Sequence, residues 1–243
     1  MLDRAVREAR RPAVLCLVAL AVPASTPVRA HEEAAHAVGS GAPAVSGDSA
    51  GLGRPLVTLR EFPANPRQYQ ADLQPLMNEI RQRHGVEEWQ LNVLTSELHR
   101  HLGLYSILGA KMGLRARELL GASLDDLRVE SLAGLQPPVS CLNDGLQVAT
   151  GASLGRGTIR VPPTETPQAA ALFTFGHRRL RLRVRDDAMK QIQVELRAAV
   201  QRHGDLSPAY FAEVRRISLE AWRDLDRKQV FEETCEPATK AEK

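Results

Sequence analysis

The stretch ELHRHLGLYSILGAKMG, residues 97–113, places two histidines two positions apart, directly before a run of helical apolar spacing. Apolar residues recur at three and four positions from Leu98 to Leu119, which predicts a helix from about Glu97 to Leu120. Histidine is only a middling helix former, so helix propensity does not explain the pair. A chemical reason for His99 and His101 is therefore needed.

Two side chains at i and i+2 share no face of a regular helix, but they can converge on one ion where the backbone is extended or just entering a helix. Glu97 to His101 is therefore expected to be the entry to the helix rather than its interior. For an isolated pair, the alternative is two exposed polar residues at a helix start. Glycines at 103, 109 and 113 each cost the helix about 1 kcal/mol relative to alanine, and they predict close approach of another backbone or a ligand.

A cysteine follows about forty residues later, in CLNDGLQVAT, which reads as a short helix ending at Gly151. Cys141 at the first turn of that helix is expected to have a lowered pKa, because the helix N-terminus favours the thiolate. Asp144 comes one turn later, where it could ligate a metal or hold a histidine proton. The alternative is that Cys141 is a small buried hydrophobe and Asp144 only a helix-start charge.

Neutral imidazole and thiolate are the preferred ligands of zinc, and three protein ligands with an open fourth position describe a catalytic or exchangeable site. The sequence therefore predicts a zinc-like divalent site formed by His99, His101 and Cys141, with Asp144 in support.

The segments HRHLGLYSILGAKMG and PPVSCLNDGLQVATGASLGRGTI, within residues 97–159, together resemble the FmdE domain, which takes its name from a component of formylmethanofuran dehydrogenase. The resemblance implies an α+β domain that binds a metal, usually zinc, with the first-block histidines and the second-block cysteine near the ion. It also implies a set of matching residues that shape the pocket: Tyr105, Gln147, Gly151, Gly155 and Gly157.

The chain departs from the family pattern at several positions. Arg100 replaces a glycine and Leu104 a proline, and many relatives carry cysteines where Gly103 and Ala152 stand. Fewer thiolates are thus offered here. The parent complex is a cytoplasmic redox enzyme of methanogenesis, so an exported relative is not expected to be a working component of it.

Outside these blocks, helices and strands alternate irregularly. A helical pattern runs from Ala71 to a stop at Gly85, and Leu127–Leu132 alternates like a strand. Further strands are expected at Thr158–Val161 and within Ala171–Val184, and two helices close the chain, the second starting at Ser207-Pro208. This order favours α+β, a small mixed sheet with packed helices and added C-terminal helices, over a doubly wound parallel sheet.

The N-terminal residues have the parts of a secretory signal: a basic start, the apolar run Ala13–Val22, and small residues before a cut after Ala30 or Ala24. We expect residues 1–30 to be a signal peptide, 31–55 a disordered linker, 56–233 the metal-binding domain and 234–243 a disordered tail. The protein is then periplasmic or secreted, with no stable membrane span after cleavage. The alternative for the leader is an amphipathic helix of a cytoplasmic protein.

Charge limits the class of partner. The formal net charge is +3, and the five arginines and two acidic residues of residues 1–30 account for it, so the remainder is neutral. Nothing in this balance favours nucleic acid. A small anionic ligand could bind the glycine-rich loop GASLGRG with Arg156 and Arg160, although a tight turn is the simpler interpretation. The arginine-rich strand HRRLRLRVR could hold an anion, or form a solvated outer face.

The expected function is a metal- or small-ligand-binding module. Two alternatives stay open: an enzyme that uses an open zinc position, for which Glu97 and Asp144 are the candidate bases, and a thiol enzyme at Cys141. After signal cleavage only Cys141 and Cys235 remain, and a bridge between them would block Cys141. The late amphipathic helices could pack on the domain or form a homodimer seam.

Overall fold

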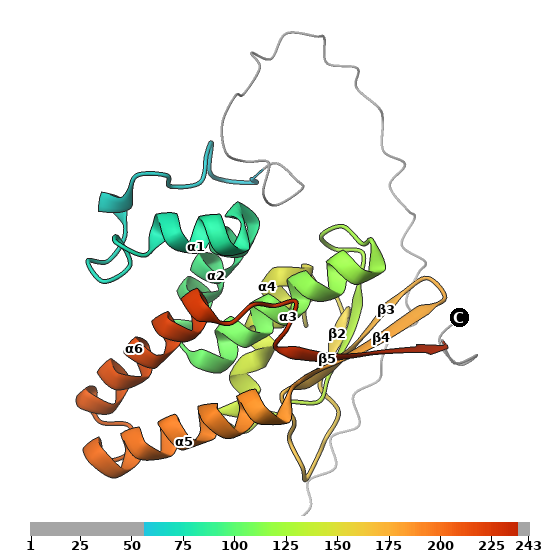
Figure 1. The fold of residues 1–243 in the computed structure, drawn as a ribbon. Helices are drawn as coiled ribbons and strands as arrows, with labels where there is room; N and C mark the ends of the chain where they lie inside the picture. Colours follow the sequence, from blue (N-terminus) through green and yellow to red (C-terminus); the bar gives the residue numbers. More distant parts are fainter. Residues whose placement is uncertain (1–55, 238–243) are drawn as a thin grey trace, which may run out of the picture. The chain divides into compact units, whose positions relative to one another are not determined.

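The structure, a computed structural model, describes residues 56–237 (Figure 1). The predicted signal peptide and linker, with His31 and His36, lie outside the described residues, as do residues 238–243. Within the described range, the elements are a short 3-10 helix, η2, six α-helices and five strands, with a second 3-10 turn, η3, before α4. No helix among residues 56–237 is both long and apolar enough to cross a bilayer.

The first helices form a layer over the C-terminal helix. After η2 (Pro66–Gln68) come α1 (Met77–His84) and α2 (Val86–His99), separated at Gly85, the predicted stop, where φ is 92°. Trp89 of α2 stacks on Trp222 with ring centroids 4.8 Å apart. Phe62, Leu73, Met77 and Ile80 complete this apolar cluster, which ties the N-terminal helices to the end of the chain.

The predicted helix from Glu97 to Leu120 is wrong at its start. Glu97 to His99 are the last turn of α2, and α3 runs from Leu104 to Leu120. The chain reverses at Arg100, which adopts a left-handed conformation with φ 66°, and Gly103 is extended before α3 begins. The two-residue spacing of the histidines therefore spans a break between helices, as an extended entry to α3 requires.

Helices α3 and α4 (Leu142–Thr150) approach each other through glycines, as the sequence predicts. A Cβ on Gly109 would lie 2.1 Å from the Leu142 carbonyl oxygen, and one on Gly145 would lie 2.1 Å from that of Ser106. Gly113 meets Ala149 in the same way, at 2.7 Å. This contact fixes the N-terminal end of α4, with Cys141 and Asp144, beside the start of α3.

The sheet has the order β2-β1-β3-β4-β5. Its strands are β1 (Arg128–Ser131), β2 (Ile159–Arg160), β3 (Ala170–Phe175), β4 (Arg178–Val184) and β5 (Phe231–Pro237). β1 and β2 pair in parallel and the other neighbours are antiparallel, so the sheet is mixed. The predicted α+β class is confirmed.

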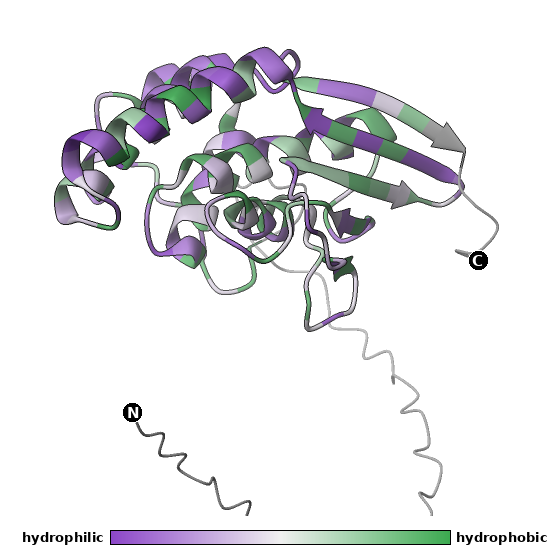
Figure 2. Ribbon diagram, turned by 90° about the horizontal axis from the view of Figure 1, so that it is seen from below, coloured by the Kyte–Doolittle hydropathy of each residue, from purple (hydrophilic) through white to green (hydrophobic). Residues whose placement is uncertain are grey.

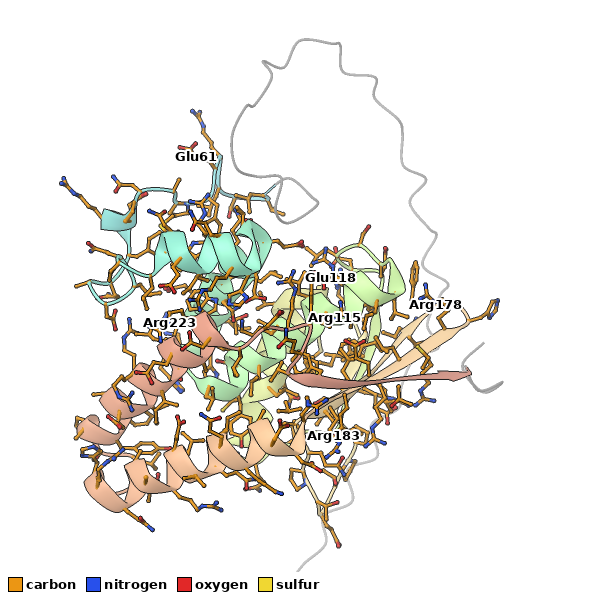
Figure 3. The ribbon with its side chains drawn as sticks, in the orientation of Figure 1. Glu61, Arg115, Glu118, Arg178, Arg183 and Arg223 are labelled. Atoms are coloured by element: carbon orange, nitrogen blue, oxygen red, sulfur yellow. The ribbon has the colours of Figure 1, made fainter. Side chains whose placement is uncertain are left out.

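Strand β4 alternates buried leucine and valine with arginine, which Figure 2 shows as alternating bands along the strands. Leu180, Leu182 and Val184 join Phe173 and the apolar face of α3 in the main core. Arg178 and Arg183 mark opposite ends of the strand in Figure 3. Arg183 pairs with Glu232 at 2.8 Å on the neighbouring strand, which supports the simpler interpretation of this stripe as a charged outer face.

Two further helices connect β4 to β5. Helix α5 (Asp186–His203) and helix α6 (Pro208–Asp224) lie beside each other in Figure 1. Ser207 accepts a hydrogen bond from the Tyr210 amide and Pro208 opens the helix, so the predicted start of α6 is confirmed.

The predicted disordered tail is wrong for residues 234–237, which belong to β5. Polar composition suggested a free end, but the strand gains its backbone hydrogen bonds from β4, with Leu180 opposite Cys235 and Val184 opposite Phe231. Pairing with a distant strand is not visible in the local pattern.

Candidate metal centre

The two histidines of the opening motif meet at the break between α2 and α3. Their ring centroids are 4.2 Å apart and the planes are inclined by 39°. Gly103 shows where the rings converge: a Cβ on this residue would lie 2.9 Å from His99 Nε2 and 3.2 Å from His101 Nε2. Two imidazole nitrogens of the kind that bind metals therefore border one small space.

Asp144 holds the ring of His99. Its Oδ2 lies 2.7 Å from His99 Nδ1, across 45 residues of sequence. Because a carboxylate accepts the proton of Nδ1, the other nitrogen, Nε2, keeps a free lone pair. Of the two roles left open for Asp144, the structure thus shows contact with a histidine.

His99 Nε2 has no hydrogen-bond partner among the described residues although the atom is buried. The side chain is only 9% exposed. Buried polar atoms are nearly always paired, so an orphaned one marks a site where something is missing or a cost is being carried. A histidine that gives one nitrogen to a carboxylate and leaves the other bare is the usual arrangement of a metal ligand.

His101 is the more exposed ring, and it faces both the protein and solvent. Desolvation nonetheless lowers its pKa, and the neighbouring His99 lowers it further. The lowered pKa favours neutral imidazole, the form that binds metals.

Cys141 stands at the N-cap of α4, as predicted, but its acidity differs from the expectation. Burial raises the pKa of the Cys141 thiol, and the nearby Asp144 carboxylate raises it further. These two effects outweigh the helix N-terminus, so the predicted lowered pKa is wrong. Cys141 and Cys235 are both free thiols, so the bridge left open between them is not formed.

The C-terminal helix supplies residues that the sequence did not indicate as part of the site. Phe211 makes an edge-on contact with His101, with ring centroids 5.7 Å apart. The pKa of Tyr105 is raised to about 12, chiefly by burial and then by the proximity of Cys141 and Tyr210. Tyr210 and Phe211 were visible only as members of an apolar helix face, and nothing local links that face to the histidines.

Four pocket residues implied by the family resemblance lie elsewhere. Gln147, Gly151, Gly155 and Gly157 follow toward the C-terminal end of α4 or beyond it, and Gly151 is about 15 Å from Cys141 at the helical rise per residue. Arg156 bonds to Asp125 at 2.6 Å and Arg160 to Glu130 at 2.5 Å. The loop GASLGRG thus uses both arginines within the chain, which favours a tight turn over an anion site.

The metal-binding groups fit an ion in part. Two imidazole nitrogens converge, and one of them is buried, unpartnered and backed by a carboxylate. Within residues 56–237, no three or more His, Cys, Asp or Glu side chains are already grouped around one point as a complete ligand set.

Comparison with known proteins gives the family. The model described as "FmdE, Molybdenum formylmethanofuran dehydrogenase operon" matches residues 98–232, more than half of the chain. The chain belongs to the FmdE family. Among solved structures, it is similar to an FmdE-like protein of tungsten formylmethanofuran dehydrogenase type from Syntrophus aciditrophicus, with 18% identity and a TM-score of 0.43 over 63% of this chain and 74% of that chain. No curated protein matches it.

Proposed function

We propose that this FmdE-family chain binds one divalent metal ion, zinc by its ligand chemistry, as a metal- or small-ligand-binding module. The observation that carries the proposal is His99: its Nδ1 is held by Asp144 at 2.7 Å while its buried Nε2 has no partner among the described residues. A metal ion would take the place of that missing partner.

The proposed ligands are His99 Nε2, His101 Nε2 and the sulfur of Cys141. The His pair supplies two nitrogens bordering one space. Cys141 is next to Asp144, which affects its acidity. Zinc in such a site would supply an open coordination position for a ligand.

The binding role is preferred over both alternatives on chemical grounds. Asp144, one of the two candidate bases, is engaged with His99. A thiol enzyme needs a thiolate near neutral pH, and the raised pKa of Cys141 keeps the metal-free thiol protonated. These observations support a site that holds a metal or small ligand.

Metal content tests the proposal. The purified full chain is incubated with zinc, freed of excess, and analysed for bound metal. We expect about one equivalent for the wild type, near-complete loss for His99→Ala and His101→Ala, and large loss for Cys141→Ser. Zinc retained at wild-type level by Cys141→Ser would remove the cysteine from the ligand set, and retention by His99→Ala would overturn the site.

Two controls separate this site from adventitious binding. His177→Ala removes an exposed histidine of the β3–β4 turn and is expected to keep the full equivalent. A variant with His31→Ala and His36→Ala removes the imidazoles that precede the described domain and is also expected to keep it. Metal lost with either control would place the binding elsewhere.

We also propose that the chain is exported, on the sequence of residues 1–30 alone. Expression of the full chain in a bacterial host followed by fractionation and N-terminal sequencing tests this. A mature periplasmic protein beginning at His31 is expected, and an uncleaved cytoplasmic product would contradict export.

A further inference from the structure

A pocket opens on the side of His101 that faces the N-terminal segment. It has a volume of about 490 Å³ and is bordered by residues from the segment before α1, the end of α2 and helix α6. Phe62, Leu73 and Leu102 give it an apolar wall. This volume and lining are those of a small-molecule site, where a few polar groups orient a mostly apolar ligand.

The most unusual residue at this pocket is Arg100. It has φ 66°, in the left-handed region that costs a residue with a side chain about 1 kcal/mol or more. Glycine is the usual choice at such a helix end. A side chain kept in an unfavourable conformation beside a cavity indicates a use for that side chain.

The charge of Arg100 is available. Arg215, the other arginine at the pocket, is taken up by Asp72 through contacts of 2.5 and 2.7 Å. Arg100 makes no ion pair within residues 56–237. Glu97, exposed on the last turn of α2, is the carboxylate at the pocket and would weaken the attraction for an anion.

A second polar group at the pocket lacks a partner. Trp222 borders the pocket and is fully buried, yet its indole Nε1 finds no hydrogen-bond acceptor among the described residues. Indole N–H only donates, so the missing group is an acceptor. Arg100 and His101 are also donors toward an acceptor, so the unmatched polar groups of this pocket all call for acceptor oxygens.

We propose that this pocket binds an organic carboxylate with a compact apolar body. Its carboxylate is held by Arg100 at the His101 end, and its apolar part lies against Phe62 and Leu102. The inference goes beyond the proposed metal site, because Arg100 and Trp222 carry it whether or not an ion is bound. His101 belongs to both, so a bound metal strengthens carboxylate binding.

Benzoate is the test ligand, with benzyl alcohol as its uncharged analogue and acetate as the carboxylate without a body. The chain contains two tryptophans, Trp89 and Trp222, which stack on each other, so intrinsic fluorescence reports occupancy. Titrations use the full chain in chelator-treated and zinc-loaded forms. Saturable binding of benzoate, at least about tenfold tighter than either analogue, is expected in both forms.

Variants assign the binding to the pocket. Arg100→Gln is expected to weaken benzoate about tenfold, and Glu97→Gln to tighten it. Arg197→Gln, on the exposed face of α5, is the matched control and should change nothing.

The outcomes separate this inference from the proposed function. Benzoate binding that depends on Arg100 in a protein that takes up no zinc would leave the inference standing and remove the metal site. Full zinc uptake with no benzoate binding, or with Arg100→Gln binding like the wild type, would overturn the inference alone. Acetate binding as tightly as benzoate would also overturn it, because the apolar wall would then play no part.

Discussion

Two clusters of polar side chains, each joining different elements, differ in whether their buried atoms have partners. In the cluster of Lys111, Glu88 and Arg227, the Lys111 ammonium bonds to Glu88 at 2.5 Å and to two carbonyl oxygens, and Arg227 binds the other Glu88 oxygen at 2.9 Å. In the His99–Asp144 pair, one ring nitrogen is bound and the other is bare. A completed network fixes structure, whereas an incomplete one indicates a ligand.

The first prediction removes the completed network. Lys111→Met leaves Glu88, whose side chain is fully buried, without its ammonium partner. We expect a loss of about 3–5 kcal/mol in the free energy of unfolding, since breaking a buried pair strands a charge. Urea denaturation measures it.

Lys190→Met is the control, because this lysine is exposed on α5. It should leave the urea midpoint nearly unchanged. If Lys111→Met were as stable as Lys190→Met, the buried cluster would not be a structural anchor.

The second prediction disturbs the scaffold of the incomplete site. In Gly145→Ala, the new Cβ would lie 2.1 Å from the Ser106 carbonyl oxygen and 2.3 Å from the Ala110 amide nitrogen. Helices α3 and α4 must then separate, at a cost of about 1–3 kcal/mol. Thermal unfolding measures this loss. Gly155→Ala, where no atom lies within 4 Å of the added Cβ, is the control and should unfold like the wild type. Equal midpoints for the two variants would show that the close helix contact is absent.

The third prediction separates the roles of the two clusters. Asp144→Asn keeps the shape of the side chain but weakens its hold on His99 Nδ1. Zinc affinity is expected to fall about 10–100-fold, while the unfolding midpoint of the metal-free protein stays close to that of the wild type. Competition with a zinc chelator measures the affinity.

Asp187→Asn, 78% exposed at the start of α5, is the matched control for this measurement. It should leave zinc affinity unchanged. A large loss of metal-free stability in Asp144→Asn, without a change in zinc affinity, would make the pair a structural one like Lys111–Glu88.

The smallest expected effect concerns thiol reactivity. Since burial and then Asp144 raise the pKa of Cys141, its thiolate fraction at pH 7 is reduced. In metal-free protein, iodoacetamide should therefore modify Cys141 more slowly than the exposed Cys235, and the rate at Cys141 should keep rising above pH 9. Peptide mass mapping over time gives both rates from one sample. Faster modification of Cys141 at pH 7 would restore the thiol-enzyme alternative.

The raised pKa also has a consequence for stability. Because folding favours the protonated thiol, the contribution of Cys141 is present below the pKa of the unfolded thiol and is lost as pH rises through the folded pKa. Cys141→Ser should therefore flatten the loss of stability of the metal-free protein on the alkaline side.

The local pattern predicted most of the secondary structure because apolar spacing and caps act within a few residues. Gly85, Ser207 and Pro208 stand where helices stop or start. The alternation of leucine and arginine in β4 gave the buried face correctly. The same pattern missed the end of α2, since the left-handed turn at Arg100 uses a residue that does not favour it.

The candidate site was predicted only as a set of residues. His99 and Asp144 were singled out by type and spacing and by resemblance to the FmdE family, but the bond between them depends on glycines that let α4 approach α3. Tyr210 and Phe211 arrive from a helix more than a hundred residues later, and no local signal marks them.

The sequence by itself determined the family, the α+β class and the residues able to bind a metal, because each follows from residue type and short-range spacing. Tertiary structure alone decided which nitrogen of His99 is bare, that burial raises the pKa of Cys141, and that the end of the chain pairs as β5. These properties depend on desolvation and on contacts between distant segments, which exist only once the chain has folded.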